Sequence, residues 1–122
     1  VIDGSGCGNV PPKCRKAVLY LREKGMPIVL TTRVPSGSVE EEYSYEGSAL
    51  SMKDSGIILG GRLSSWKARL LLALAMGKTK NIEEIKSCFL GIREEWKTIV
   101  GQGILSQINH GLKTLKKLFI IM

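Results

Sequence analysis

Two side chains near the start of the chain could take part in chemistry, the thiol of Cys7 and the carboxamide of Asn9, both set among glycines. A thiol close to a helix N-terminus can act as a nucleophile because the helix dipole favours its thiolate form. A carboxamide can cap a helix or hold a ligand. The residues alone leave both choices open: Cys7 as a nucleophile or a small buried filler, and Asn9 as a helix cap or a ligand contact.

The glycines around these residues suggest phosphate binding by backbone N–H groups at a helix N-terminus as a third kind of chemistry. The spacing does not match the dinucleotide-binding fingerprint, and no Gly-Lys-Ser/Thr follows. Glycine also permits positive φ angles and close backbone approach. We therefore expect Gly6 and Gly8 to form a structural turn that displays Asn9 at the carboxyl end of a strand, where open α/β sheets bind ligands.

The composition disfavours several other classes of site. The three cysteines include no Cys-x-x-Cys pair and the single histidine, His110, is far from them, so we expect no metal, no cofactor and no disulfide framework. The net charge of +7 allows nucleic-acid binding, but no matching motif accompanies it, and we expect a solvated helical face instead of a nucleic-acid partner. No apolar run approaches the ~20 residues of a membrane span, so membrane association is not expected.

The elements expected to position Asn9 form a strand–helix–strand unit. Pro11 and Pro12 suit the first turn of a helix that ends at Gly25, and residues 26–32 are typical of a buried strand. A connection of this length between two strands implies a parallel crossover. The following loop, residues 33–38, should then lie beside the glycine turn at the same edge of the sheet.

Arg33 opens that loop, and it could bind a carboxylate or pair with one of the glutamates at positions 40–42. Further along, glycines, caps and apolar spacing predict four more elements. These are a helical turn over 48–53, a buried strand within 55–61, a helix over 66–76 that begins at Ser64 or Ser65 and ends at Gly77, and a short helix over 81–89 with Asn81 as its cap and Glu84 in a capping box.

Together these elements predict an α/β domain over residues 1–90, small and three-layered, with a short parallel sheet. Residues 91–122 are predicted to be a helical C-terminal extension, since Ile104, Ile108, Leu112, Leu115 and Phe119 recur at helical spacing. The extension could pack back on the domain, bind a partner or a membrane surface, or be partly disordered. Because the chain lacks an initial methionine and opens on what resembles half a strand, we expect it to be part of a longer protein.

Three motifs in the same order resemble the C-terminal domain of bacterial-type L-asparaginases over about residues 1–89. They are a Gly-x-Gly-Asn turn, a strand end running into Thr-Arg, and a Lys-Ala-Arg helix. In this chain they read Gly6-Cys7-Gly8-Asn9-Val10-Pro11, Gly25-Met26-Pro27-Ile28-Val29-Leu30-Thr31-Thr32-Arg33-Val34-Pro35-Ser36-Gly37, and Ser65-Trp66-Lys67-Ala68-Arg69-Leu70-Leu71-Leu72-Ala73-Leu74-Ala75.

The resemblance implies a flavodoxin-like sheet and a place for each functional group. The family's threonine nucleophile and its supporting residues lie in a larger N-terminal domain, so this chain itself should contain no catalytic residue. The family's substrate-side asparagine falls on Asn9, and Glu46 is the nearest candidate for a substrate-side glutamate of some members. The implied partners are the protein's own N-terminal domain, further subunits in a homodimer or tetramer, and a small-molecule amide substrate.

The implied function is that of the C-terminal domain of an enzyme that hydrolyses L-asparagine to L-aspartate and ammonia. In this role the domain would supply subunit-interface and substrate-orienting groups, in the cytoplasm or alternatively the periplasm. Two other interpretations stay open. One is a non-catalytic binding or assembly module derived from the domain, and the other is part of a related amidohydrolase or amidotransferase.

Overall fold

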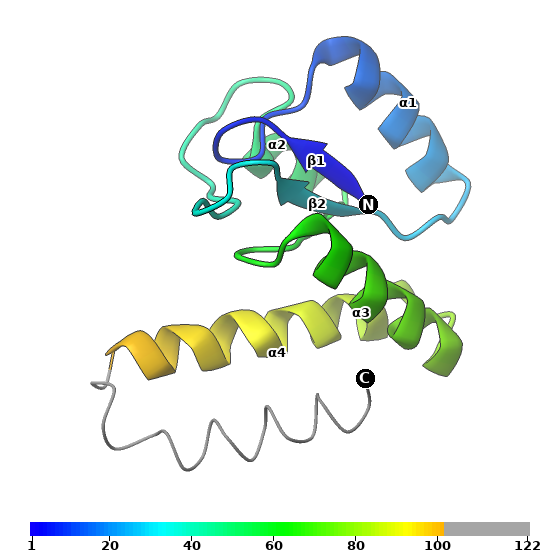
Figure 1. Cartoon of the computed structure of the whole chain (residues 1–122). Coiled ribbons are helices and arrows are strands. Elements are labelled where there is room, and N and C mark those ends of the chain that lie inside the picture. The colour runs from blue at the N-terminus through cyan, green and yellow to red at the C-terminus, as the bar shows by residue number, and fades with distance from the viewer. Residues whose placement is uncertain (102–122) are drawn as a thin grey trace. The chain divides into compact units, whose positions relative to one another are not determined.

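A computed structural model of the chain describes residues 1–101, with side chains as far as residue 92 (Figure 1). Residues 1–89 form one compact unit, and a second begins at residue 90. None of the helices described here is long and apolar enough to cross a membrane. The elements in chain order are β1 (Ile2–Gly4), α1 (Pro12–Glu23), β2 (Val29–Thr32), α2 (Ala49–Asp54), β3 (Ile58–Leu59), α3 (Ser65–Lys78) and α4 (Ile82–Gly101).

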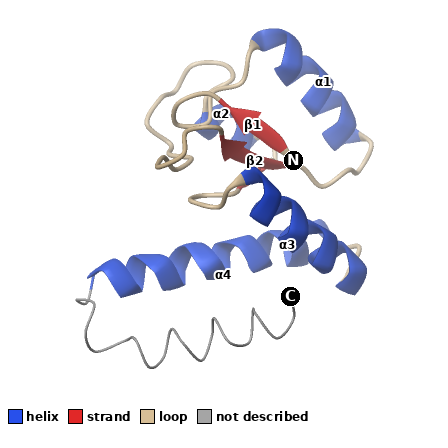
Figure 2. Ribbon diagram, viewed as in Figure 1, coloured by secondary structure: helices blue, strands red, loops and turns tan. Residues whose placement is uncertain are grey.

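The sheet of the first unit has the order β1-β2-β3, with both strand pairs parallel. Its register places Ile2 opposite Leu30 and Val29 opposite Ile58. Parallel neighbours need a crossover between them, and α1 and α2 supply the two crossovers (Figure 2). The predicted α/β domain with a short parallel sheet is therefore confirmed.

The strands alternate their side chains between two apolar cores, which makes the unit three layers thick. Leu30 packs on the side of α1 and α2, whereas Val29 packs on the side of α3 and the first turns of α4. The first core also contains Val10, Val18, Ile28, Val39, Ala49, Met52 and Ile57, and the second contains Ile58, Ala68, Leu72, Ala75, Ile85 and Phe89. Each strand residue thus links the sheet to one helical layer.

The helix ends correct several details of the sequence interpretation. Helix α3 runs through Gly77 to Lys78, because a glycine weakens a helix without having to end it. Ser64 occupies the N-cap position of α3, but its side chain makes no capping hydrogen bond. The sequence predicts that helix α4 stops at Phe89, but the helix continues to Gly101. The apolar spacing from residue 104 to residue 119 lies outside the described residues.

At the start of α4 the predicted cap is confirmed, since the Glu83 N–H donates to Asn81 Oδ1 at 2.9 Å. The predicted capping box is not formed. It would need Glu84 to accept from the Asn81 N–H, and that group donates to Thr79 Oγ1 at 3.1 Å. The turn before α4 is therefore closed by threonine and asparagine.

Candidate functional site

The carboxyl ends of β1 and β2 carry two loops that meet, as expected from parallel strands. The Arg33 N–H donates to the Gly4 carbonyl at 3.0 Å, and the Glu40 N–H donates to the Cys7 carbonyl at 3.1 Å. The Thr32 hydroxyl also donates to the Gly6 carbonyl. These bonds tie the second loop to the glycine turn at both of its ends, which makes this edge of the sheet the candidate site.

The glycine turn is closed by a short antiparallel bridge between Ser5 and Asn9. The Ser5 N–H donates to the Asn9 carbonyl at 3.0 Å, and the Asn9 N–H donates back to the Ser5 carbonyl at 2.8 Å. Gly6 and Gly8 have φ values of 52° and 101°, which L side chains rarely adopt. A Cβ on Gly4 would lie 2.7 Å from the Gly8 backbone. The turn therefore depends on glycine both for its dihedral angles and for its close packing.

Asn9 does not cap α1. The helix begins at Pro12, the N-cap position is Pro11, and no side chain makes a capping hydrogen bond there. Proline fixes φ near −65° and lacks an N–H, so Pro11 with a ψ of 148° keeps the chain extended until the helix starts. The capping interpretation of Asn9 is therefore wrong.

The carboxamide of Asn9 is half-buried, and its oxygen has no partner among the described residues. Asn9 Oδ1 is shielded from solvent yet accepts no hydrogen bond from these groups. A buried acceptor normally finds a donor, because leaving one unpaired costs about 1–3 kcal/mol. Among the described residues this acceptor is therefore left without a partner.

Cys7 has the wrong electrostatics for an activated nucleophile. Its Sγ donates to Glu42 Oε2 at 3.5 Å. Partial burial raises the pKa of the Cys7 thiol, the hydrogen bond and charge of Glu42 raise it further, and the charge of Glu40 adds to the effect. A nucleophilic cysteine requires the opposite shift. The nucleophile interpretation of Cys7 therefore loses its physical support.

Glu46 lies on the loop before α2 and pairs with α1. Its Oε1 accepts from Arg15 Nη1 at 2.6 Å. The next residue, Gly47, accepts a hydrogen bond from the Val10 N–H at 2.8 Å through its carbonyl. The structure thus brings the Glu46 loop against the residue that follows Asn9, although the two loops are far apart in sequence.

The acidic run and Arg33 do not pair with one another. Glu41 binds Lys53 at 2.8 Å, and Glu42 accepts from Cys7. Within residues 1–92 the Arg33 side chain forms no ion pair, so of its two possible roles the pairing with residues 40–42 is wrong. The described part of the chain also holds no cluster of three or more potential metal ligands.

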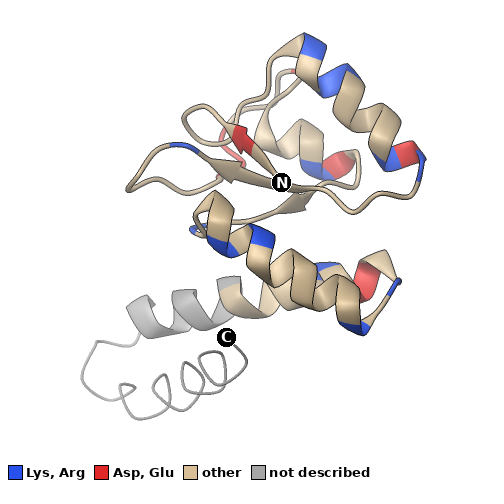
Figure 3. Ribbon diagram, turned by 45° about the vertical axis from the view of Figure 1, so that its right-hand side comes forward, with Lys and Arg blue, Asp and Glu red and all other residues tan. Residues whose placement is uncertain are grey.

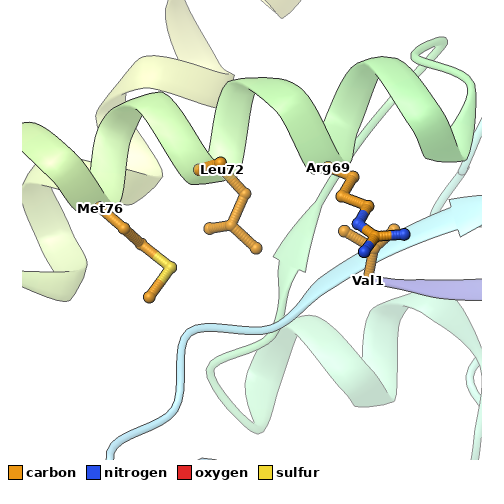
Figure 4. A pocket seen from close by; sticks show the side chains of 5 residues that line it. Val1, Arg69, Leu72 and Met76 are labelled. Carbon is orange, nitrogen blue, oxygen red and sulfur yellow. The ribbon is translucent and has the colours of Figure 1, made fainter.

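A separate hollow lies at the other edge of the sheet, where β1 begins. It encloses about 420 Å³ and is lined by Val1 and one side of α3, with Arg69, Leu72, Ala73 and Met76 (Figure 4). The hollow is open, and Figure 4 shows the Arg69 side chain lying beside Val1 at one end of it. Because parallel strands send their functional loops to the carboxyl edge, we do not assign this hollow to the candidate site.

Comparison with known proteins matches residues 1–89 to the glutaminase/asparaginase C-terminal domain family. An L-asparaginase of Bacillus licheniformis is 35% identical over 89 residues, which are 73% of this chain and 28% of that protein. A subunit of the glutamyl-tRNA(Gln) amidotransferase of Aeropyrum pernix is 29% identical over 73% of this chain and 20% of its own length. The matched part of the chain therefore spans between 19% and 28% of the length of the curated relatives it matches.

The structural comparison agrees with the sequence comparison. The structure of a probable cytoplasmic L-asparaginase from Campylobacter jejuni superposes with a TM-score of 0.60 at 33% sequence identity. The match covers 72% of this chain and 26% of that structure.

Proposed function

The chain belongs to the glutaminase/asparaginase C-terminal domain family, and we propose that it acts as the C-terminal domain of an L-asparaginase, an enzyme that hydrolyses L-asparagine to L-aspartate and ammonia. The similarity to the Bacillus licheniformis L-asparaginase supports this choice. In this proposal the domain works with its own N-terminal domain in a cytoplasmic homodimer or tetramer. A periplasmic location is the alternative.

The observation that carries the proposal is the unpaired carboxamide oxygen of Asn9 at the carboxyl edge of the sheet. Hydrolysis of an amide needs a nucleophile, a base and a site that stabilises the oxyanion. Cys7, the thiol in the turn, has a raised pKa and is kept protonated. The contribution of this domain is therefore orientation, in which Asn9 accepts a hydrogen bond from the amino-acid end of the substrate.

The test replaces the matched segment of the Bacillus licheniformis L-asparaginase with residues 1–89 and compares two asparagine variants. Asn9→Ala should lower kcat/KM for L-asparagine about 10- to 100-fold with little change in melting temperature, because it removes a substrate contact. Asn81→Ala is the matched control, since Asn81 caps α4 far along the chain. It should lower the melting temperature and leave kcat/KM unchanged.

A large loss of melting temperature in Asn9→Ala with unchanged kinetics would contradict the proposal. The 122-residue chain alone should release no ammonia from L-asparagine, because the proposed nucleophile lies in another domain. Measurable hydrolysis by this chain would place a nucleophile within it.

The match to a glutamyl-tRNA(Gln) amidotransferase favours a second candidate, a related amidohydrolase or amidotransferase. Kinetics with L-asparagine, L-glutamine and an amide linked to tRNA separate the two candidates. A third candidate is a non-catalytic binding or assembly module that keeps this domain and has lost the enzymatic activity. It predicts that the reading frame upstream of Val1 encodes no Thr-Gly-Gly-Thr motif, whereas the enzyme predicts one.

A further inference from the structure

Helix α1 contacts the rest of the domain through two arginines as well as through apolar groups. Arg15 and Arg22 flank Val18 on the inner face of the helix, at the spacing that places residues on one side. Figure 3 colours the ribbon for lysine or arginine near both ends of this helix. Each inner arginine binds a different loop, so the two can be compared directly.

Arg15 is the more buried partner of its ion pair. Its side chain is 20% exposed, that of Glu46 is 74% exposed, and the Nη1 to Oε1 distance is 2.6 Å. The Nε donor of Arg15 is buried and has no acceptor among the described residues. A partly desolvated guanidinium with one carboxylate partner gains more from that contact than an exposed pair does. Glu46 is therefore held by an anchor that the helix has already positioned.

The loop held in this way leads directly to Asn9. Gly47 follows Glu46, has a φ of 93°, and accepts the Val10 N–H at 2.8 Å. A Cβ on Gly47 would lie 2.4 Å from the Val10 carbonyl oxygen, so the two backbones are in close contact. The chain of contacts runs from Arg15 through Glu46 and Gly47 to Val10, and Val10 is bonded covalently to Asn9.

Arg22 offers a comparison within the same helix. Its Nε donates to the Gly56 carbonyl at 3.1 Å, in the turn between α2 and β3. It holds a backbone carbonyl near the other end of the helix, and within residues 1–92 it forms no ion pair with Glu46. An effect that is common to both arginines would reflect helix packing, and an effect limited to Arg15 would reflect the loop.

We propose that Arg15 is a positioning residue that fixes the Glu46 loop against Val10 and so sets the position of the Asn9 carboxamide. The proposal rests on the proposed function of Asn9 as a substrate contact. In this proposal Glu46 supplies the carboxylate through which Arg15 holds the loop. The proposal makes neither side chain a catalytic residue.

The test measures backbone amide hydrogen exchange in the 122-residue chain by two-dimensional NMR. Arg15→Met keeps the length of the side chain and removes the charge, and it should speed exchange of the Val10 amide roughly 3- to 10-fold. Arg15→Lys should restore exchange to within about 2-fold of the unaltered chain because it keeps a cation. The Ile58 amide, which donates to Ile28 within the sheet, is the internal reference.

Two further variants make the result decisive. Arg22→Met should leave Val10 exchange unchanged. Glu46→Gln, at an exposed position that tolerates substitution, should speed it as Arg15→Met does, and the double variant should show no additional effect. The Asn9 side-chain NH₂ resonances should shift in Arg15→Met and Glu46→Gln but not in Arg22→Met.

The proposal is overturned if Val10 exchange is unchanged in Arg15→Met, if Arg22→Met speeds it equally, or if Ile58 exchanges faster by the same factor. The kinetics of Asn9→Ala decide the proposed function separately. If Asn9→Ala leaves the kinetics unchanged, Asn9 has no role in substrate binding. The link from Arg15 to Val10 would still be decided by amide exchange alone.

Discussion

Helices α1 and α3 cover opposite faces of the same sheet, yet they are attached to it by different chemistry. Helix α3 contributes Ala68, Leu72 and Ala75 to the second core. Helix α1 has one fully buried side chain, Val18, and its half-buried arginines bind a carboxylate and a carbonyl on loops. Apolar packing has no preferred direction, whereas a charge-assisted hydrogen bond fixes the position of its partner.

The difference separates two tasks within one small domain. The α3 side supplies free energy of folding through buried area, and its loss should unfold the unit. The α1 side buries a single apolar side chain of the helix, and its Arg15 contact ends on the Glu46 loop, which meets Val10 next to Asn9. Substitutions on the two sides should therefore differ in kind, with global stability affected on one and loop position on the other.

The largest effect should come from the α3 side. Leu72→Ala should lower the free energy of unfolding by about 2–4 kcal/mol, because it removes buried methyl groups and leaves a cavity. Chemical denaturation measures it. Val18→Ala on α1, where the replaced side chain is equally buried, is the matched control and should cost about 1–2 kcal/mol. A larger loss in Val18→Ala would break the comparison.

A smaller loss should follow from Gly47→Ala on the loop that α1 holds. The added Cβ would meet the Val10 carbonyl oxygen at 2.4 Å, and the φ of 93° is strained for alanine. We expect a loss of about 1–3 kcal/mol. The exchange rate of the Val10 amide should also increase by a larger factor than that of the Ile58 amide, as measured by NMR. Equal acceleration at both amides would mean that the loop and the sheet open together.

A smaller effect again is expected at Cys7, where the chemistry of the site can be followed by alkylation. Because its pKa is raised, Cys7 should react with iodoacetamide more slowly than an unperturbed thiol at the same pH, and peptide mass spectrometry can follow the reaction. Glu42→Gln removes a negative charge that favours the thiol over the thiolate. It should therefore speed alkylation of Cys7 a few-fold at about pH 8. An unchanged rate of Cys7 alkylation in Glu42→Gln would contradict the contact between Cys7 and Glu42.

The smallest effect should be an increase in stability. Gly77→Ala in the last turn of α3 should raise the free energy of unfolding by about 0.5 kcal/mol, because alanine restricts the unfolded chain and favours the helix. The site is exposed, and a Cβ there meets no atom of the described residues within 4 Å. A decrease in the melting temperature would show that glycine is needed at this position.

The sequence was sufficient where the signal is local or periodic. The parallel strand–helix–strand unit, the meeting of the two loops and the Asn81 cap are predictions that the structure confirms. Turn residues, alternation and capping act over a few positions, so they can be read from neighbours in the chain. The predicted extent of α3 is correct to within a few residues at each end for the same reason.

Contacts between distant residues could not be predicted in this way. The cap prediction for Asn9 failed because Val10 and Pro11 hold the chain extended before α1 begins. The pairing that was one of two possible roles for Arg33 does not form, and Lys53 and Cys7 reach Glu41 and Glu42 instead. The pair of Arg15 and Glu46 gave no sequence signal, since it forms only when α1 and the loop before α2 are already folded. The substrate-binding roles of Asn9 and Glu46 stay predictions.

The bridge between Ser5 and Asn9 has a consequence for the order of events during folding. Its partners are four positions apart, and loops of about this size close within roughly 10–100 ns. The contact between Val10 and Gly47 spans several elements, and a contact between such distant residues should form later. We therefore expect the backbone of Asn9 to acquire its shape early and its carboxamide to reach its final direction among the last steps.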